Sequence, residues 1–220
     1  MTERQSSVDD TERLSKLIGR IYDAALDPSL WSDVLHDSAV FVGGVAAALF
    51  MKDTVRKAHN TVYTWGYDPE FTRIYIERYV ALDPFTIGQF LFREGDVVTL
   101  TDLVSVQEFK QSRFYREWVC PQGWIDALGG TLEKTSTSYA AVSVIRHQRN
   151  GLADDGARRR MRLLVPHVRR AVIVSKVIDL HKVEAAALAD TLDDLPVGML
   201  LVDSASRVVH ANRAARVLLG

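Results

Sequence analysis

The sequence is poor in cysteine, in net charge and in long apolar runs. Cys120 is the single cysteine among 220 residues, so neither a disulfide framework nor a cysteine-rich zinc module is expected. Lys plus Arg number 27 against 28 for Asp plus Glu, and the resulting net charge of −1 gives no support for binding a polyanion. No apolar run approaches the ~18 residues of a membrane span, and the first residues lack a secretion signal. A cytoplasmic protein without a membrane partner is expected.

Motifs for catalysis, metals and cofactors are also missing from the sequence. The six histidines show no HxH or HExxH pairing. The pairs Gly43-Gly44 and Gly129-Gly130 lack the remaining spacing of a phosphate-binding loop. No activating constellation accompanies Cys120 as a nucleophile. We therefore expect a protein that is not an enzyme and that has no metal site and no cofactor.

The residues that are present predict a globular α/β chain, since 47% are hydrophobic and 9% aromatic. A capping box at Asp9 and Glu12 predicts the start of a first helix. Asp-Pro pairs at 27, 68 and 83 predict three more, because Asp is a preferred N-cap and Pro fits the first helical turn. A further helix is predicted across Val106–Val119.

Alternating or continuous apolar runs predict five strands in the same region. They are Val45–Lys52, Thr61–Trp65, Val97–Leu100, Trp124–Glu133 and Tyr139–His147. Short links between strands, with helices before and between them, predict a GAF/PAS-like α-β-α sensor: a mainly antiparallel five-stranded sheet flanked by helices. We expect this sensor domain to cover residues 8–153, with a long C-terminal signalling helix after it.

The long helix is predicted over residues 154–192, with Pro166 inside it. Its apolar positions step alternately by three and four, which is typical of a heptad repeat. Two interpretations remain open, and they can hold for different turns of the helix. In one the helix pairs two chains as a homodimer, and in the other it packs on its own sheet.

Residues 195–220 read as a second, truncated domain. Val197–Val202 and Val208–His210 predict two strands, and a helix begins near Asn212. Two strands and one helix do not bury a core alone. The segment is similar to the first hairpin and helix of a PAS domain.

Three segments resemble the sensor half of bacterial LuxR-type transcription regulators. They are YDPEFTRIY at 67–75, followed by Tyr79 and Asp83-Pro84, then FYREWVCPQGW at 114–124, and LVPHVRRA at 164–171. The resemblance covers most of residues 10–185. It implies a sensor that binds a small molecule and passes its occupancy to a DNA-binding helix-turn-helix domain, for which these 220 residues hold no sequence.

The resemblance also implies ligand-binding residues. The positions that hold an acyl-homoserine lactone in the family fall on Phe71, Tyr75, Asp83 and Ser143. Phe71 lacks the indole N–H that the family's Trp donates, and the spacing from Tyr75 to Asp83 is one residue short. The sequence thus favours a more apolar or different ligand, or none.

The same residues also have structural interpretations. Asp83 is expected to cap a helix. Phe71, Tyr75 and Tyr79 form one helical stripe that either packs as core or lines a pocket, and Trp65 is large enough for both roles. The leading prediction is a ligand-binding site formed by Phe71, Tyr75, Asp83, Ser143, Trp65 and Tyr79. The alternative is a ligand-free interaction and dimerisation module with a filled core.

Overall fold

A computed structural model describes residues 2–53, 61–88 and 91–219 of the chain. The chain divides into two compact units, Met1–Ile173 and Val174–Gly220. The division falls inside one continuous helix, α6 (Asp155–Asp193).

A five-stranded antiparallel sheet forms the centre of the first unit. Its strands are β1 (Ala46–Asp53), β2 (Thr61–Trp65), β3 (Val97–Thr99), β4 (Trp124–Lys134) and β5 (Ser138–His147). The spatial order is β2-β1-β5-β4-β3, and each neighbouring pair is antiparallel. The predicted fold class is therefore confirmed, and the last strand of the sheet in sequence, β5, lies at its centre.

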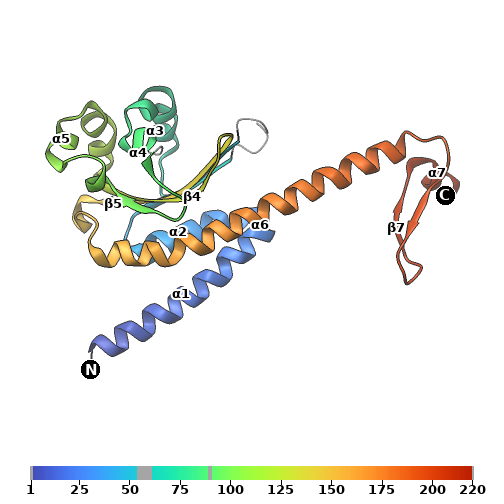
Figure 1. Cartoon of the computed structure of the whole chain (residues 1–220), viewed down its shortest axis with the longest axis horizontal. Helices are drawn as coiled ribbons and strands as arrows, with labels where there is room; N and C mark the ends of the chain where they lie inside the picture. Colours follow the sequence, from blue (N-terminus) through green and yellow to red (C-terminus); the bar gives the residue numbers. More distant parts are fainter. Residues whose placement is uncertain (1, 54–60, 89–90, 220) are drawn as a thin grey trace. The chain divides into compact units, whose positions relative to one another are not determined.

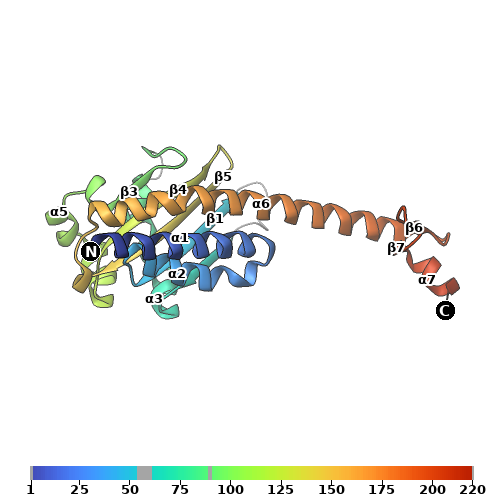
Figure 2. The ribbon, with the colours of Figure 1, turned by 90° about the horizontal axis from the view of Figure 1, so that it is seen from below.

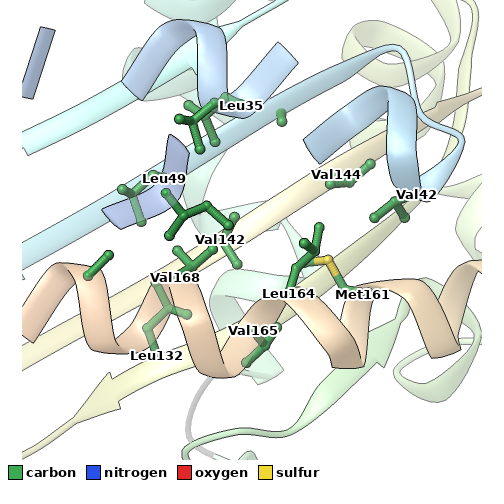
Figure 3. Packing of buried hydrophobic residues seen from close by; sticks show 14 of the residues in the cluster. Leu35, Val42, Leu49, Leu132, Val142, Val144, Met161, Leu164, Val165 and Val168 are labelled. Atoms are coloured by element: carbon green, nitrogen blue, oxygen red, sulfur yellow. The ribbon is translucent and has the colours of Figure 1, made fainter. Parts of the chain in front are cut away.

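One face of this sheet is covered by helices from both ends of the unit. These are α1 (Thr2–Leu26), α2 (Trp31–Val42) and the first half of α6, which lie side by side beneath the strands (Figure 2). Alternate residues of β5, such as Val142 and Val144, point into this layer and are almost fully buried. Figure 3 shows them packed with Leu49 of β1 and with Leu164 of α6. This layer, between the sheet and the three helices, contains the aliphatic core of the unit.

The opposite face carries a series of short helices and turns (Figure 1). In chain order they are α3 (Pro69–Ile74), a π-helical turn η3 (Tyr75–Tyr79), η4 (Val80–Leu82), α4 (Pro84–Gly88), η6 (Leu100–Asp102), α5 (Val106–Gln111), a second π-helical turn η7 (Tyr115–Val119) and η8 (Cys120–Gln122). Elsewhere in the chain, the 3-10 turn η1 (Pro28–Leu30) lies between α1 and α2, and η9 (Gln148–Asn150) lies between β5 and α6. The core on this face is mainly aromatic.

Helix starts at the three Asp-Pro pairs are confirmed. Asp27 accepts a hydrogen bond from the backbone N–H of Ser29 at 3.0 Å. Asp68 accepts from Glu70 and Phe71 at 2.8 and 3.2 Å. Asp83 does the same at the start of α4, so all three act as N-caps as their sequence context indicated.

Two helix boundaries predicted from the sequence are wrong. The first helix begins at Thr2 rather than after Asp9, because no proline or glycine interrupts the segment that precedes the expected cap. The helix expected across Val106–Val119 is broken at Ser112, whose backbone is extended. The Ser112 hydroxyl instead accepts a hydrogen bond from Tyr115 N–H at 3.1 Å, which starts a new helical turn there.

Helix α6 agrees with the predicted long helix, and its first half is part of the core. Met161, Leu164, Val168 and Ala171 are at most 2% exposed. The interpretation that the helix packs on its own sheet therefore holds for these turns. Farther along, Val177, Val183 and Leu188 are exposed.

The second unit contains the end of α6, a two-stranded sheet and a short helix. β6 (Leu200–Val202) pairs with β7 (Val208–Ala211), and α7 spans Arg213–Leu219. The expected strand start at Val197 is wrong, because strand pairing begins only at Leu200. Buried Asn212 ties these parts together: its amide donates to the carbonyls of Leu192 and Val197 at 2.8 Å, and its oxygen accepts from Met199 N–H.

We predict that Gly130→Ala destabilises the first unit by ~1–3 kcal/mol, because an added methyl group must displace the helix that packs on β4. A Cβ at Gly130 would lie 2.3 Å from a methyl carbon of Val165 on α6. Urea unfolding followed by tryptophan fluorescence measures the effect. In the control, Gly19→Ala on an open face of α1, stability should instead rise by about 0.5–1 kcal/mol. Equal effects of the two changes would contradict this packing.

Candidate functional site

The candidate site begins with the face of β5 that points away from α6. Its residues Ala141 and Ser143 are small and remain half-buried, whereas the alternate residues on the other face are almost fully buried. On this face Ala48 of β1 and Gly129 of β4 stand opposite Ser143 in the strand pairing. The centre of the sheet therefore presents a floor of short side chains beneath the α3–α4 segment.

Two local features position Tyr75 and Asp83 above this floor. Asp68 caps α3, and the helix continues from there into the π-helical turn η3, which begins with Tyr75. Asp83 then has an extended backbone and starts α4 through its Asp-Pro pair. π-Helical turns occur frequently at functional sites. The second one in this unit, η7, lies in the same aromatic core.

The carboxylate of Asp83 joins these elements. Its Oδ1 accepts a hydrogen bond from Phe85 N–H at 2.9 Å, and its Oδ2 accepts one from the Tyr75 hydroxyl at 2.8 Å. Burial raises the pKa of Asp83 above its ordinary value, while the two hydrogen bonds act in the opposite direction. Asp83 is therefore a helix cap, as predicted, and also accepts a hydrogen bond from Tyr75.

Two further tyrosines complete the polar part of the site. Burial raises the pKa of Tyr67 strongly, a side-chain hydrogen bond with Ser143 lowers it, and the charge of Asp83 raises it further. Burial also raises the pKa of Tyr139, which hydrogen-bonds with Thr131 and again feels the charge of Asp83. The structure therefore brings Tyr75 and Asp83 into direct contact and places Ser143 near Tyr67, whose pKa the Asp83 charge raises.

An aromatic cluster forms the wall of the site beside Tyr75. The rings of Phe114 and Trp118 stack with centroids 5.2 Å apart, and Tyr75 lies 4.9 Å from Trp118. The Trp118 indole donates to the carbonyl of Phe71 at 2.8 Å, which fixes α3 against η7. The side chain of Phe71 is half-buried in the same cluster. Phe71 therefore belongs to the wall.

Tyr79 belongs to the aromatic wall, but its polar end points elsewhere. Its hydroxyl donates to Oε2 of Glu117 at 2.7 Å, and Arg113 pairs with the same carboxylate. The Arg113 guanidinium also lies 5.9 Å from the Tyr79 ring centroid. This group ties η3 to η7 at the protein surface.

Trp65 lies on the other face of the sheet from the network. In β2 it is opposite Ala47, a residue of the aliphatic core, and its ring is 4.5 Å from that of His36 on α2. The structure does not bring Trp65 together with the other predicted site residues. The alternation of β2 places Trp65 on the same face as Tyr63, but it does not say which face of the sheet that is.

Sequence reasoning missed Tyr67, Tyr139 and Thr131 as members of the site. A signal for Tyr139 was present, because it shares a strand face with Ala141 and Ser143. To predict Thr131, one would need the register between β4 and β5, which places Thr131 opposite Ala141. To predict Tyr67 as a site residue, one would need to know the path that the chain takes between β2 and α3.

The groups of the network are deep in the protein and still partly accessible. Burial raises the pKa of Tyr67, Asp83 and Tyr139, yet each keeps a fraction of its surface in contact with solvent. Small-molecule sites combine a few convergent polar groups with an apolar wall, and these groups with the aromatic cluster have that combination.

No protein-family model and no curated protein matches the sequence. Solved structures do match. The LBD domain of VqsR from Pseudomonas aeruginosa aligns over 73% of this chain and 94% of that chain, with a TM-score of 0.57 and 17% identity. The N-acylhomoserine lactone dependent LuxR family transcription factor CepR2 from Burkholderia cenocepacia aligns over 74% and 93%, with a TM-score of 0.54 and 14% identity.

A third structure, residues 1–171 of SdiA from Escherichia coli in solution, aligns over 79% of this chain and 97% of that chain, with a TM-score of 0.52 and 13% identity. The chain therefore has the fold of the sensor domains of LuxR-type regulators, as the motifs predicted. Across the described parts of the chain, no helix is both long and apolar enough to cross a membrane.

We predict that Asp83→Asn changes how stability depends on pH. Because the folded protein raises the pKa of Asp83, the native state binds this proton more tightly, and the residue lowers stability progressively as pH rises through that pKa. Asn keeps a capping oxygen but has no charge.

Urea unfolding between about pH 4 and pH 7 tests this. The stability of the variant relative to the wild type should increase with pH. A difference that stays constant with pH would show that burial of the charge costs nothing here. Asp68→Asn, at the exposed cap of α3, is the matched control.

Proposed function

We propose that the chain is the signal-sensing region of a LuxR-type transcription regulator, and that it binds a small molecule between β5 and the α3–α4 segment. The observation that carries the proposal is the network of Asp83, Tyr75, Tyr67 and Ser143, which is deep in the fold and partly accessible above a floor of small residues. CepR2, which shares the fold, is lactone dependent, and this supports a ligand site in the present chain.

Contacts at the β3 edge of the sheet tie the segment that follows β3 to helix α6. Arg158 of α6 donates to both carboxylate oxygens of Asp102 and to the hydroxyl of Thr99. Buried Asp126 accepts from Leu100 N–H and from Ala153 N–H, just before the helix. Movement of the segment that follows β3 would therefore change the anchoring of α6. For a switch, the ligand must bind the two arrangements with different affinity.

The occupant we propose for the exposed part of α6 is a second copy of the chain. Val174, Val177 and Leu188 are exposed apolar residues of this helix, and their separations of three and eleven residues place them on one side of it. The alternating three and four spacing of this helix is typical of parallel helix pairs. DNA would be bound by a domain outside these 220 residues, and the proposed localisation is cytoplasmic.

Native mass spectrometry of the purified protein, before and after denaturing extraction, tests the ligand proposal. We expect a stoichiometric small molecule that is lost on denaturation. Tyr75→Phe should retain less of it, because Tyr75 orients the Asp83 carboxylate, whereas Tyr79→Phe, whose hydroxyl points to Glu117, should retain as much as the wild type.

Absence of any retained molecule, with no small molecule raising the unfolding temperature, would favour the alternative of a ligand-free interaction module. In that case the half-buried residues of β5 would act only as packing for the α3–α4 segment.

We predict that Val177→Glu weakens dimerisation by at least about tenfold, because an unpaired charge buried at a helix pair costs several kcal/mol. Light scattering over a dilution series measures the dissociation constant. Asp179→Lys is the control, since two residues rotate a helix by about 200° and place this charge on the opposite side. If Val177→Glu dimerises like the wild type, the interface lies elsewhere in the chain.

A further inference from the structure

The groups around the Asp83 carboxylate are all neutral or acidic. Tyr75 and the Phe85 N–H bind it directly, and Tyr67 and Tyr139 lie close enough for its charge to raise their pKa. Among residues 2–53, 61–88 and 91–219, no lysine, arginine or histidine forms an ion pair with Asp83. The site therefore holds an acidic side chain inside the fold without a cation beside it.

This carboxylate has acceptor capacity left over. An ionised carboxylate offers about four lone-pair sites, and the hydrogen bonds from Tyr75 and Phe85 occupy two of them. Removing a charge from water costs several kcal/mol, which two hydrogen bonds offset only in part. A ligand that brings N–H donors and a positive charge would remove most of the remaining cost.

Two donors of the site, in contrast, are already engaged. The Tyr75 hydroxyl donates to Asp83, and the Trp118 indole donates to the Phe71 carbonyl. A ligand whose carbonyl oxygen accepts from Tyr75 or Trp118 would have to break these hydrogen bonds, whereas a ligand that donates to Asp83 would not.

Electron-rich rings lie beside Tyr75 and Tyr67, the two tyrosines nearest to this carboxylate in the aromatic cluster. Tyr67 lies edge-on to Trp124 at 5.1 Å, Trp124 to Trp118 at 5.3 Å, and Trp118 is 4.9 Å from Tyr75. The faces of Trp and Tyr rings attract cations, and the attraction strengthens when water is excluded. Ring and carboxylate therefore favour the same kind of ligand.

We propose that the ligand of this site carries a protonated amine whose N–H groups donate to Asp83, with its apolar part against the aromatic wall. This inference rests on the proposed function, since it names the chemical class of the ligand at the same site. It separates this site from one that recognises a neutral acyl lactone.

Calorimetric titration of the full chain with matched probes tests the proposal. Hexylamine carries the charge, 1-hexanol is its neutral counterpart, and N-hexanoyl-homoserine lactone represents the neutral lactones. We expect hexylamine to bind about tenfold more tightly than 1-hexanol or the lactone at neutral pH. Asp83→Asn should abolish this preference, because it removes the charge and keeps a capping oxygen, and Asp68→Asn should preserve it.

A second measurement keeps the test independent of the Asp83 variant. Lowering the pH towards 4 should weaken hexylamine binding to the wild type and leave 1-hexanol unchanged, since Asp83 gains a proton while the facing Tyr67, Tyr75 and Tyr139 stay neutral. Equal affinity for the two probes, a preference that survives in Asp83→Asn, or equal pH dependence would each overturn the proposal.

Other outcomes separate this inference from the proposed function. Preferential binding of the lactone would overturn the amine proposal and leave the sensor function intact. Failure of all three probes to bind would also overturn the amine proposal. If the purified protein in addition retains no small molecule, the sensor function fails with it.

Discussion

The architecture of the site depends on one buried carboxylate. Asp83 caps α4, accepts the hydroxyl of Tyr75 from the end of α3, and lies near the tyrosines that stand over β5. Its two hydrogen bonds join the π-helical turn η3 to α4. The same burial that makes this arrangement costly without a partner makes it suited to binding one.

The two faces of the central strand β5 lie in different environments. Val142 and Val144 of β5 pack into the aliphatic core with α2 and α6, and this core does not require a ligand. Ala141 and Ser143, one residue away in each case, form a floor of small side chains on the other face. Because side chains alternate along a strand, one face of β5 can stabilise the fold while the other face remains available for a ligand.

Local chemistry explains what the sequence predicted well. An Asp-Pro pair specifies a helix start through its own side chain and ring, and the strands follow from short-range alternation, so the sheet and the capping role of Asp83 could be predicted. The face occupied by Trp65 and the contact of Tyr67 with Ser143 depend on strand register and on the packing of distant segments. Such properties are absent from any short window of sequence.

The most direct test of the central claim is a crystal structure of the protein as purified from cells, with attention to the volume between β5 and α4. The account predicts electron density for a small molecule that contacts Asp83 and stands over Ser143. Density limited to protein, with the side chains of α3 and α4 closed onto β5 and Ser143 fully buried, would contradict it.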